Sequence, residues 1–291
     1  MSELEKFGGP EGIRTPDLLT ASQTRSQLRH GPTTREEKMI PPTSSTTPFA
    51  ATMLRDPMKT SEIDPSVLKG GGHLALPDAP GPHPGVVVIH EAYGLNDNIR
   101  DIAGRLADQG YAALAVDLFS GRNKAICMTR YMAGMLRGSV DRYGIADLKN
   151  ALTHLAAQPE VDAECIGAIG FCMGGGFAIA WACTDDRLKA IAPFYGANPR
   201  PLDAVERACP VVGSYPEKDF TASAGRALDE ALDRHGIAHD IKIYAGAGHS
   251  FFNDRSRAHH KASAADSWTR VLQFFGEHLA SNQQQAHPAA N

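Results

Sequence analysis

The sequence predicts an α/β protein, in which helices cover both faces of one mostly parallel sheet within a single domain. Two observations carry this prediction. From Leu68 onward, short apolar runs alternate with segments in which apolar residues recur at helical spacing. Strand and helix alternate at the spacing of consecutive crossover units, which place successive strands parallel to one another.

The predicted strands are short apolar runs rich in β-branched residues. The run 85–90 follows a Pro-rich turn and reads Gly-Val-Val-Val-Ile-His, as expected of a strand buried on both faces. The remaining strands are predicted at 112–117, 165–169, 188–194, 210–214 and 240–244.

The predicted helices are marked by apolar residues three and four positions apart. The first has this spacing over 99–107, and Gly110 closes it. A second covers 145–155, before Pro159. The later helices are predicted at 177–182, at 227–232 before Gly236, and at 268–275.

The two ends of the chain differ from this pattern. Residues 1–65 are rich in Pro, Gly, Ser, Thr and Arg without a sustained period, which predicts a disordered N-terminal extension. Residues 66–281 form the predicted domain, and 282–291 a disordered tail. The segment 9–17 reads like translated noncoding sequence, so one hypothesis is that translation starts at Met39, Met53 or Met58.

Composition excludes several classes of function. A net charge of −4 and the lack of a basic stripe argue against nucleic acid as a partner. No stretch approaches the ~20 apolar residues of a membrane span. The five cysteines are scattered and odd in number, and no Cys-x-x-Cys pair occurs. We therefore expect a cytoplasmic protein without a metal or cofactor; the sequence leaves monomer and dimer open.

The segment 168–176, Ala-Ile-Gly-Phe-Cys-Met-Gly-Gly-Gly, joins a predicted strand to a predicted helix. Its Gly-x-Cys-x-Gly spacing is that of a nucleophile elbow, with Cys172 at the sharp turn and small residues where strand and helix pass closely. The alternative is that Cys172 is a buried structural thiol beside a glycine-rich turn. A phosphate-binding loop is disfavoured, because its motifs are absent.

An acid and a histidine follow later strands. Asp219 follows the strand 210–214, and His249 follows the strand 240–244. Nucleophile, acid and histidine thus occur in the chain order of the α/β-hydrolase fold. A thiol needs a base to take its proton, and the base needs an acid to orient it. Asp219 could instead cap the next helix, and Glu217 is its rival as the acid.

The loop after the strand 85–90 supplies further candidates. In this fold it holds the second oxyanion donor, so the backbone N–H groups of Ala92 and Met173 are expected to form the oxyanion hole. Glu91 ends the apolar strand, where a carboxylate needs partners unless it is a solvated loop residue.

Three motifs together resemble the dienelactone hydrolase family: 90–96 (His-Glu-Ala-Tyr-Gly-Leu-Asn), 170–175 (Gly-Phe-Cys-Met-Gly-Gly) and 248–251 (Gly-His-Ser-Phe). The resemblance spans roughly 72–279 and implies an α/β-hydrolase domain with a Cys172, Asp219, His249 triad. It also implies that Glu91 hydrogen-bonds the resting thiol and, on substrate binding, helps to form the thiolate. Family enzymes open enol-lactones such as 4-carboxymethylenebut-2-en-4-olide.

The sequence departs from the family at one position. Family members carry an arginine four residues after the histidine, where it grips the substrate carboxylate, whereas this chain has Asn253. An arginine fork is a geometric device that asparagine does not replace. The arginines that follow the histidine or lie in the insertion after the strand 112–117 do not align with it: 255, 257, 130, 137 and 142.

The segment 120–138 carries apolar residues at partly helical spacing, among them Ile126, Met128 and Tyr131, with Met132, Met135 and Leu136 further on. We expect it to pack over the sheet; a part in the pocket rim is the second interpretation.

These observations predict a small-molecule hydrolase that cleaves an ester or lactone through a cysteine acyl-enzyme. Two alternatives stay open. One is a binding or sensing protein on a hydrolase scaffold, because fold does not guarantee chemistry. The other is a thioesterase or peptidase-like activity at the same site.

Overall fold

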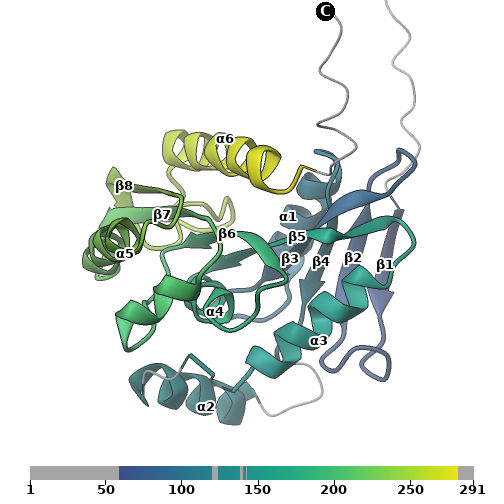
Figure 1. Ribbon diagram of the computed structural model, residues 1–291, viewed down its shortest axis with the longest axis horizontal. Helices are drawn as coiled ribbons and strands as arrows, with labels where there is room; N and C mark the ends of the chain where they lie inside the picture. The colour runs from purple at the N-terminus through teal and green to yellow at the C-terminus, as the bar shows by residue number, and fades with distance from the viewer. Residues whose placement is uncertain (1–58, 120–123, 138–139, 142, 281–291) are drawn as a thin grey trace, which may run out of the picture. The chain divides into compact units, whose positions relative to one another are not determined.

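The computed structural model describes residues 59–119, 124–137, 140–141 and 143–280 (Figure 1). The predicted tail and nearly all of the predicted N-terminal extension, including the candidate start methionines, lie outside these residues.

In the described part of the chain, eight strands form one sheet in the order β1-β2-β4-β3-β5-β6-β7-β8. The first two strands run antiparallel to their neighbours, and all other pairs are parallel, as predicted. The bounds are β1 (Lys59–Ile63), β2 (Gly72–Leu76), β3 (His83–Ile89), β4 (Ala112–Val116), β5 (Val161–Phe171), β6 (Leu188–Phe194), β7 (Val211–Lys218) and β8 (His239–Gly248).

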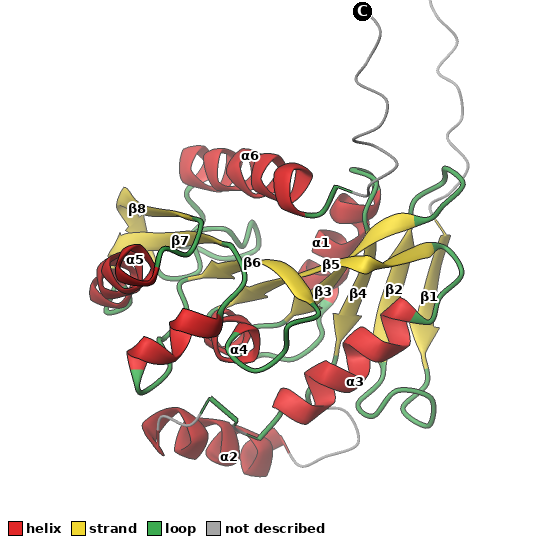
Figure 2. Ribbon diagram, in the orientation of Figure 1, coloured by secondary structure: helices red, strands yellow, loops and turns green. Residues whose placement is uncertain are grey.

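Helices cover both faces of this sheet (Figures 1 and 2). One layer holds α1 and α6, and the other holds α3, α4 and α5. The helices are α1 (Asp97–Ala107), α2 (Lys124–Arg137), α3 (Ile145–Ala156), α4 (Met173–Ala182), α5 (Ala222–His235) and α6 (Lys261–His278), with a short 3₁₀ helix at Leu202–Arg207.

The central strands form the core because side chains on both of their faces are buried. In β3, Val86 and Val88 pack with the layer of α1 and α6, whereas Val87 and Ile89 pack with the other layer. Alternate residues of a strand point to opposite faces, so a run of four apolar residues serves both layers. Each such side chain contributes about 1.5–3 kcal/mol when fully buried.

The antiparallel pair β1 and β2 is absent from the sequence prediction. The strand β1 lies inside the range 1–65 that was assigned to the extension, so the sheet begins at Lys59 rather than after residue 65. Its sequence, Lys-Thr-Ser-Glu-Ile, is polar and almost entirely exposed. An edge strand held mainly by backbone hydrogen bonds to one neighbour does not need the apolar alternation by which strands are recognised.

The segment 120–138 is helical over α2, in agreement with its partly helical spacing. Cys127 and Tyr131 are buried in the core, and the Tyr131 hydroxyl donates to the Leu118 carbonyl oxygen at 2.9 Å. Ile126 is exposed. The side chains of Met132, Met135 and Leu136 lie outside the described residues.

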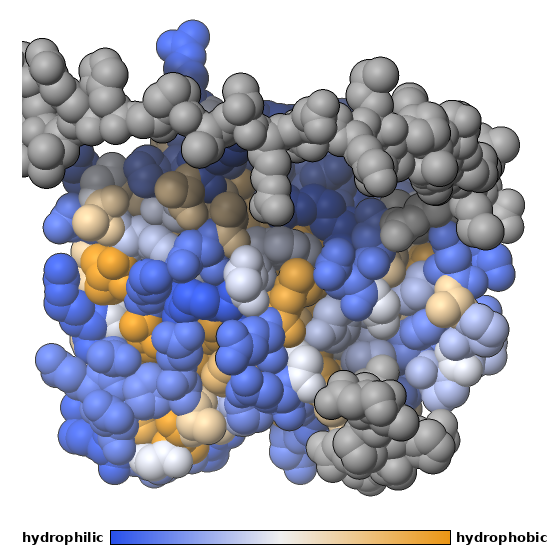
Figure 3. Space-filling model, turned by 90° about the horizontal axis from the view of Figure 1, so that it is seen from above, coloured by the Kyte–Doolittle hydropathy of each residue, from blue (hydrophilic) through white to orange (hydrophobic). Residues whose placement is uncertain are grey.

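No helix in the described residues combines the length and apolar content that a bilayer span requires. On the face that Figure 3 shows, apolar side chains form small, separate patches among hydrophilic ones.

Candidate active site

The predicted site residues follow strands that end at one edge of the sheet. Because β3, β5, β7 and β8 are mutually parallel, their carboxyl ends meet there. Glu91 comes just after β3, Cys172 directly after β5, Asp219 directly after β7, and His249 directly after β8.

Cys172 sits at the turn between β5 and α4 in a backbone conformation that side chains rarely adopt, with φ 53° and ψ −113°. Its N–H donates to the Phe194 carbonyl oxygen at 3.0 Å, and its own carbonyl oxygen accepts the Gly176 N–H at 3.2 Å. These bonds, from the neighbouring strand and the first helical turn, hold the strained conformation. The side chain is partly exposed, unlike the buried structural thiol of the alternative interpretation.

Two glycines of the elbow are required by contact rather than by flexibility. A methyl group on Gly170 would overlap the backbone of Gly174, and one on Gly174 would overlap the carbonyl oxygen of Ile89. The absence of a side chain at Gly170 lets β5 pass close to α4, and its absence at Gly174 lets α4 pass close to β3. The Gly-x-Cys-x-Gly spacing therefore sets how tightly the nucleophile turn is packed.

Asp219 and His249 are joined by a short contact of 2.6 Å between Asp219 Oδ2 and His249 Nδ1. The carboxylate side chain is 4% exposed and the imidazole 31%. Asp219 Oδ2 also accepts the Thr221 hydroxyl at 2.6 Å. Asp219 is not the cap of the next helix, because α5 is preceded by Thr221 at the cap position.

The rival acid has a different partner. Glu217 is exposed and accepts the backbone N–H of Gly246 at 2.9 Å through Oε2. Of the two carboxylates that the sequence left open, the structure brings Asp219 to the histidine. Glu217 instead bonds Gly246 near the end of β8, the strand that precedes His249.

The imidazole of His249 reaches both the thiol and the carboxylate. The neighbouring Cys172 side chain in the first place, and Asp219 in the second, raise the pKa of His249 to about 9, and burial opposes the rise. Partners that favour the charged form of the ring shift its pKa in this direction. The structure thus brings Cys172, Asp219 and His249 together from three separate loops.

Two aromatic rings lie against His249. The Phe220 ring stacks at 5.7 Å between centroids with an interplanar angle of 15°, although Phe220 is 78% exposed. The buried Tyr195 ring lies at 5.0 Å and is tilted by 54°. Tyr195 has a positive φ of 41° at the end of β6. The rings restrict the imidazole to a plane that keeps its two nitrogens on their partners.

Glu91 is 3% exposed, so it is not a solvated loop residue. Its Oε1 accepts the Ser250 hydroxyl at 2.9 Å and the Tyr195 hydroxyl at 3.3 Å, and its Oε2 accepts the Asn253 amide at 3.3 Å. Burial and the charges of Glu91 and Cys172 raise the pKa of Tyr195 far above its usual value, which keeps the phenol protonated as a donor. Among the described residues, no hydrogen bond joins Glu91 to the Cys172 thiol.

Sequence reasoning missed Tyr195 and Ser250. Both are non-glycine residues with positive φ, 41° and 61°, so their local backbone is strained. The sequence offers only their positions as a signal: Tyr195 directly follows β6, and Ser250 directly follows His249. Their partner Glu91 lies more than a hundred residues earlier in the chain.

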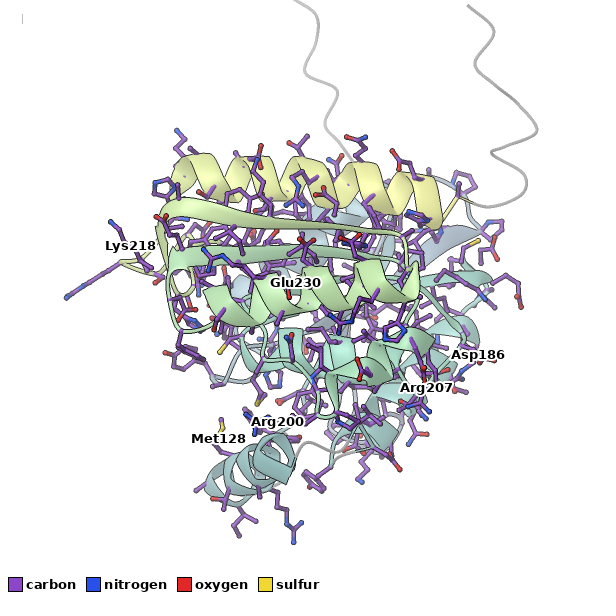
Figure 4. All side chains as sticks on the ribbon, turned by 60° about the vertical axis from the view of Figure 1, so that its left-hand side comes forward. Met128, Asp186, Arg200, Arg207, Lys218 and Glu230 are labelled. Carbon is purple, nitrogen blue, oxygen red and sulfur yellow. The ribbon has the colours of Figure 1, made fainter. Side chains whose placement is uncertain are left out.

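Two described residues near the position where the resemblance implies a carboxylate-gripping arginine have other partners. Asn253 is bonded to Glu91, and Arg255 pairs with Asp97 at 3.2 Å on the surface. In the view of Figure 4, the labelled Arg200, which is exposed, projects in the direction of α2.

The two predicted oxyanion donors are the backbone N–H groups of Ala92, in the loop after β3, and of Met173, at the start of α4. Met173 is the first residue of α4, so its N–H has no acceptor within the helix. Among the described residues, neither Met173 nor Ala92 donates its N–H to another backbone or side-chain group.

This sheet, with a nucleophile elbow after one strand and a histidine–carboxylate pair after two later ones, defines the class of the α/β hydrolases. Residues 71–279 match the dienelactone hydrolase family. The chain belongs to that family. It is therefore a hydrolase that acts on esters or lactones.

Two relatives that share one name with each other are similar to this chain over most of the domain. The chain is 34% identical over 237 residues to a "Putative carboxymethylenebutenolidase" of Saccharolobus solfataricus, covering 69% of this chain and 91% of the relative. A protein of the same name from Yersinia pestis is 32% identical over 225 residues, or 72% of this chain and 84% of the relative.

Solved structures agree in fold. The crystal structure of a "Putative Dienelactone Hydrolase" from Klebsiella pneumoniae superposes with a TM-score of 0.66 at 28% identity, covering 76% of this chain and all of the other. A "Dienelactone Hydrolase-like Promiscuous" phosphotriesterase from metagenomic libraries gives 0.67 at 28% identity, over 77% of this chain and 99% of the other.

Proposed function

We propose that the protein hydrolyses an ester or lactone through a thiol acyl-enzyme on Cys172. The observation that carries the proposal is the position of His249, which bonds the Asp219 carboxylate at 2.6 Å and also reaches the thiol. A base held between a nucleophile and an orienting acid is the arrangement that activates a thiol.

In the acylation step, Cys172 sulfur attacks the carbonyl carbon while its proton passes to Nε2 of His249. The carbonyl π electrons move to the oxygen, and the N–H groups of Ala92 and Met173 stabilise the resulting oxyanion. When the tetrahedral intermediate collapses, the C–O bond to the leaving group breaks. The leaving oxygen takes the proton from His249, and a lactone ring opens without release of a second product.

In the second step, water attacks the thioester carbon. His249 takes a proton from the water, the oxyanion forms again, and the C–S bond breaks. The sulfur recovers its proton from His249, and the carboxylic acid leaves. Removing one oxyanion donor typically slows such a reaction by ~10²–10³, so the two N–H groups would carry a large share of the rate enhancement.

We propose that Glu91 acts on the resting site through its charge and its network. In the described structure its three donors come from Tyr195, Ser250 and Asn253, which fixes the loop that carries His249. The resemblance implies that, on substrate binding, Glu91 helps to form the thiolate.

The substrate is proposed to be dienelactone-like in its ring but not gripped by an arginine at position 253. Asn253 donates to Glu91, which places a carboxylate rather than a cation behind it. The chemistry favours a lactone whose carboxylate is absent or esterified. Comparing a carboxylated dienelactone with its methyl ester tests this: a kcat/KM at least as high for the ester is expected, and a strong preference for the acid would contradict it.

The central test is the variant Cys172→Ala, which should lose hydrolysis of p-nitrophenyl acetate while keeping its circular dichroism spectrum and Tm. Cys165→Ser is the matched control. Burial and the nearby Asp162 raise the pKa of Cys165 to about 11, so its thiol is a poor nucleophile and its loss should leave turnover unchanged. Retained activity in Cys172→Ala would refute the thiol mechanism. Thioesters in the same assay identify the thioesterase alternative.

A further inference from the structure

We propose that His90 is a positioning residue that aims the Ala92 N–H at the oxyanion by holding the peptide group between Glu91 and Ala92. The proposal rests on the thiol mechanism above, in which Ala92 supplies one of the two oxyanion donors. It concerns a residue that contacts neither the substrate nor the thiol.

The His90 side chain is completely buried at the end of β3, where a polar ring must have partners. Its Nδ1 lies 2.6 Å from the carbonyl oxygen of Glu91, and its Nε2 lies 3.1 Å from the backbone nitrogen of Leu118. The first contact is within its own loop, and the second reaches the loop after the neighbouring strand β4.

These two contacts fix which nitrogen of the ring carries the proton. The Leu118 N–H can only donate, so Nε2 of His90 is the acceptor and has no proton. In the neutral ring the proton then sits on Nδ1, which donates it to the Glu91 carbonyl oxygen. A neutral ring bonded at both nitrogens has one orientation and one tautomer.

The link from His90 to the oxyanion hole is the rigidity of one peptide unit. The carbonyl of Glu91 and the N–H of Ala92 belong to the same planar, trans group, so they point in opposite directions. Holding the oxygen therefore fixes the direction of the N–H. The same oxygen also accepts the Gly94 N–H at 3.3 Å, which leaves it bound from two sides. The Ala92 N–H itself has no acceptor among the described residues.

The His90 ring is in turn held by its surroundings. The Phe119 ring lies 4.9 Å away, and Asp117 Oδ1 lies 3.7 Å from Nε2. Asp117 Oδ1 also accepts the Phe119 N–H at 2.8 Å, which closes the turn after β4. The loop that carries the Ala92 N–H is thus anchored to the end of the neighbouring strand β4, so this N–H keeps a fixed direction before substrate binds. Such preorganisation is what makes an oxyanion hole effective.

Two substitutions test separately the two hydrogen bonds of His90, one with the Glu91 carbonyl oxygen and one with the Leu118 N–H. In His90→Asn the side-chain amide nitrogen takes the place of Nδ1, so it can still donate to the Glu91 oxygen while the bond from Leu118 is lost. In His90→Gln the amide lies at the place of Nε2, so it can still accept from Leu118 while the Glu91 oxygen loses its donor. Both variants keep a buried polar group of similar size.

The experiment measures three quantities for each variant: the acylation rate with p-nitrophenyl acetate, the affinity for an alkyl trifluoromethyl ketone, and the rate of Cys172 alkylation by iodoacetamide. The ketone forms a tetrahedral oxyanion on the thiol, whereas alkylation forms none. For His90→Gln we expect acylation and ketone affinity to fall together by ~10–10²-fold, a fraction of the loss of a whole donor. Alkylation should stay within about threefold, and His90→Asn should keep most of all three.

Each other result overturns the proposal. Equal losses of acylation and alkylation in His90→Gln would show that the histidine only supports the loop. Unchanged acylation and ketone affinity in that variant would show that the peptide needs no such anchor. If the wild-type protein forms no thiol adduct with the ketone, the thiol mechanism fails first, and the role of His90 fails with it. The three failures are distinguishable because the wild-type adduct is measured independently.

Discussion

The variant Asp219→Asn tests the link between the orienting carboxylate and the imidazole. It keeps the size of the side chain but removes the charge opposite His249 Nδ1, at a contact of 2.6 Å. Hydrogen bonds to a charged group contribute about 1.5–3 kcal/mol, which corresponds to roughly 10–10²-fold in rate. Because an amide can also select the wrong tautomer of the histidine, the loss can extend to ~10⁴-fold in kcat.

The same change should move the pH dependence. The pKa of His249, about 9 in the native site, should fall toward its ordinary value of 6.5 when the carboxylate is neutralised. Because His249 must be neutral to take the thiol proton, the wild-type kcat/KM should rise with pH until about pH 9. In the variant this rise should be complete at a lower pH. The assay is p-nitrophenyl acetate hydrolysis between pH 5 and 10.5, corrected for spontaneous hydrolysis at each pH.

The raised pKa of His249 also predicts how the stability of the folded protein changes with pH. The contribution of protonated His249 is complete below pH 6.5 and is lost as pH rises through about 9. In Asp219→Asn the pKa lies nearer 6.5 and much of this contribution is absent, so the difference in Tm between the two proteins should be largest below pH 6.5 and shrink toward pH 10.

Glu217→Gln is the matched control, because Glu217 was the rival acid and bonds Gly246 instead. It should keep turnover within about threefold, as an exposed side chain outside the triad normally does. If Asp219→Asn kept wild-type turnover and its acid limb did not move, the role assigned to Asp219 would be wrong. The same loss in Glu217→Gln would also contradict it.

Further predictions concern packing around the site. Gly174→Ala should lower the free energy of unfolding by about 1–3 kcal/mol and abolish turnover, because its methyl group overlaps the Ile89 carbonyl oxygen. Gly276→Ala is the control, since there is open space at its Cβ. Thermal melts should show its stability unchanged or up to about 1 kcal/mol higher. Phe220→Ala should reduce kcat/KM several-fold in the ester assay while changing stability by less than about 0.5 kcal/mol, because the ring is exposed and stacks on the imidazole. Asn253→Ala should lower stability by about 1 kcal/mol in urea titration, since one donor to the buried Glu91 is lost; an unchanged midpoint would show that this bond contributes nothing.

The amino-acid sequence determined the features that depend on short-range sterics and periodicity. The run 85–90 and the helical spacing over 99–107 placed a buried strand and its helix within two residues of β3 and α1. The nucleophile turn was predictable because the strained φ of Cys172 needs small neighbours at fixed offsets. The order of Cys172, Asp219 and His249 after successive strands then implied one edge of the sheet, because parallel strands end together.

Tertiary structure alone decided which side chains meet. Nothing local separates Asp219 from Glu217, which are two residues apart at the end of β7. Only the tertiary structure brings Asp219 to His249 and Glu217 to Gly246. The partners of Glu91 lie 104 to 162 positions away in the chain. The polar edge strand β1 is likewise fixed by its neighbour and not by its own pattern. Contacts between distant segments depend on how the sheet is ordered, and periodicity within a segment carries no information about that order.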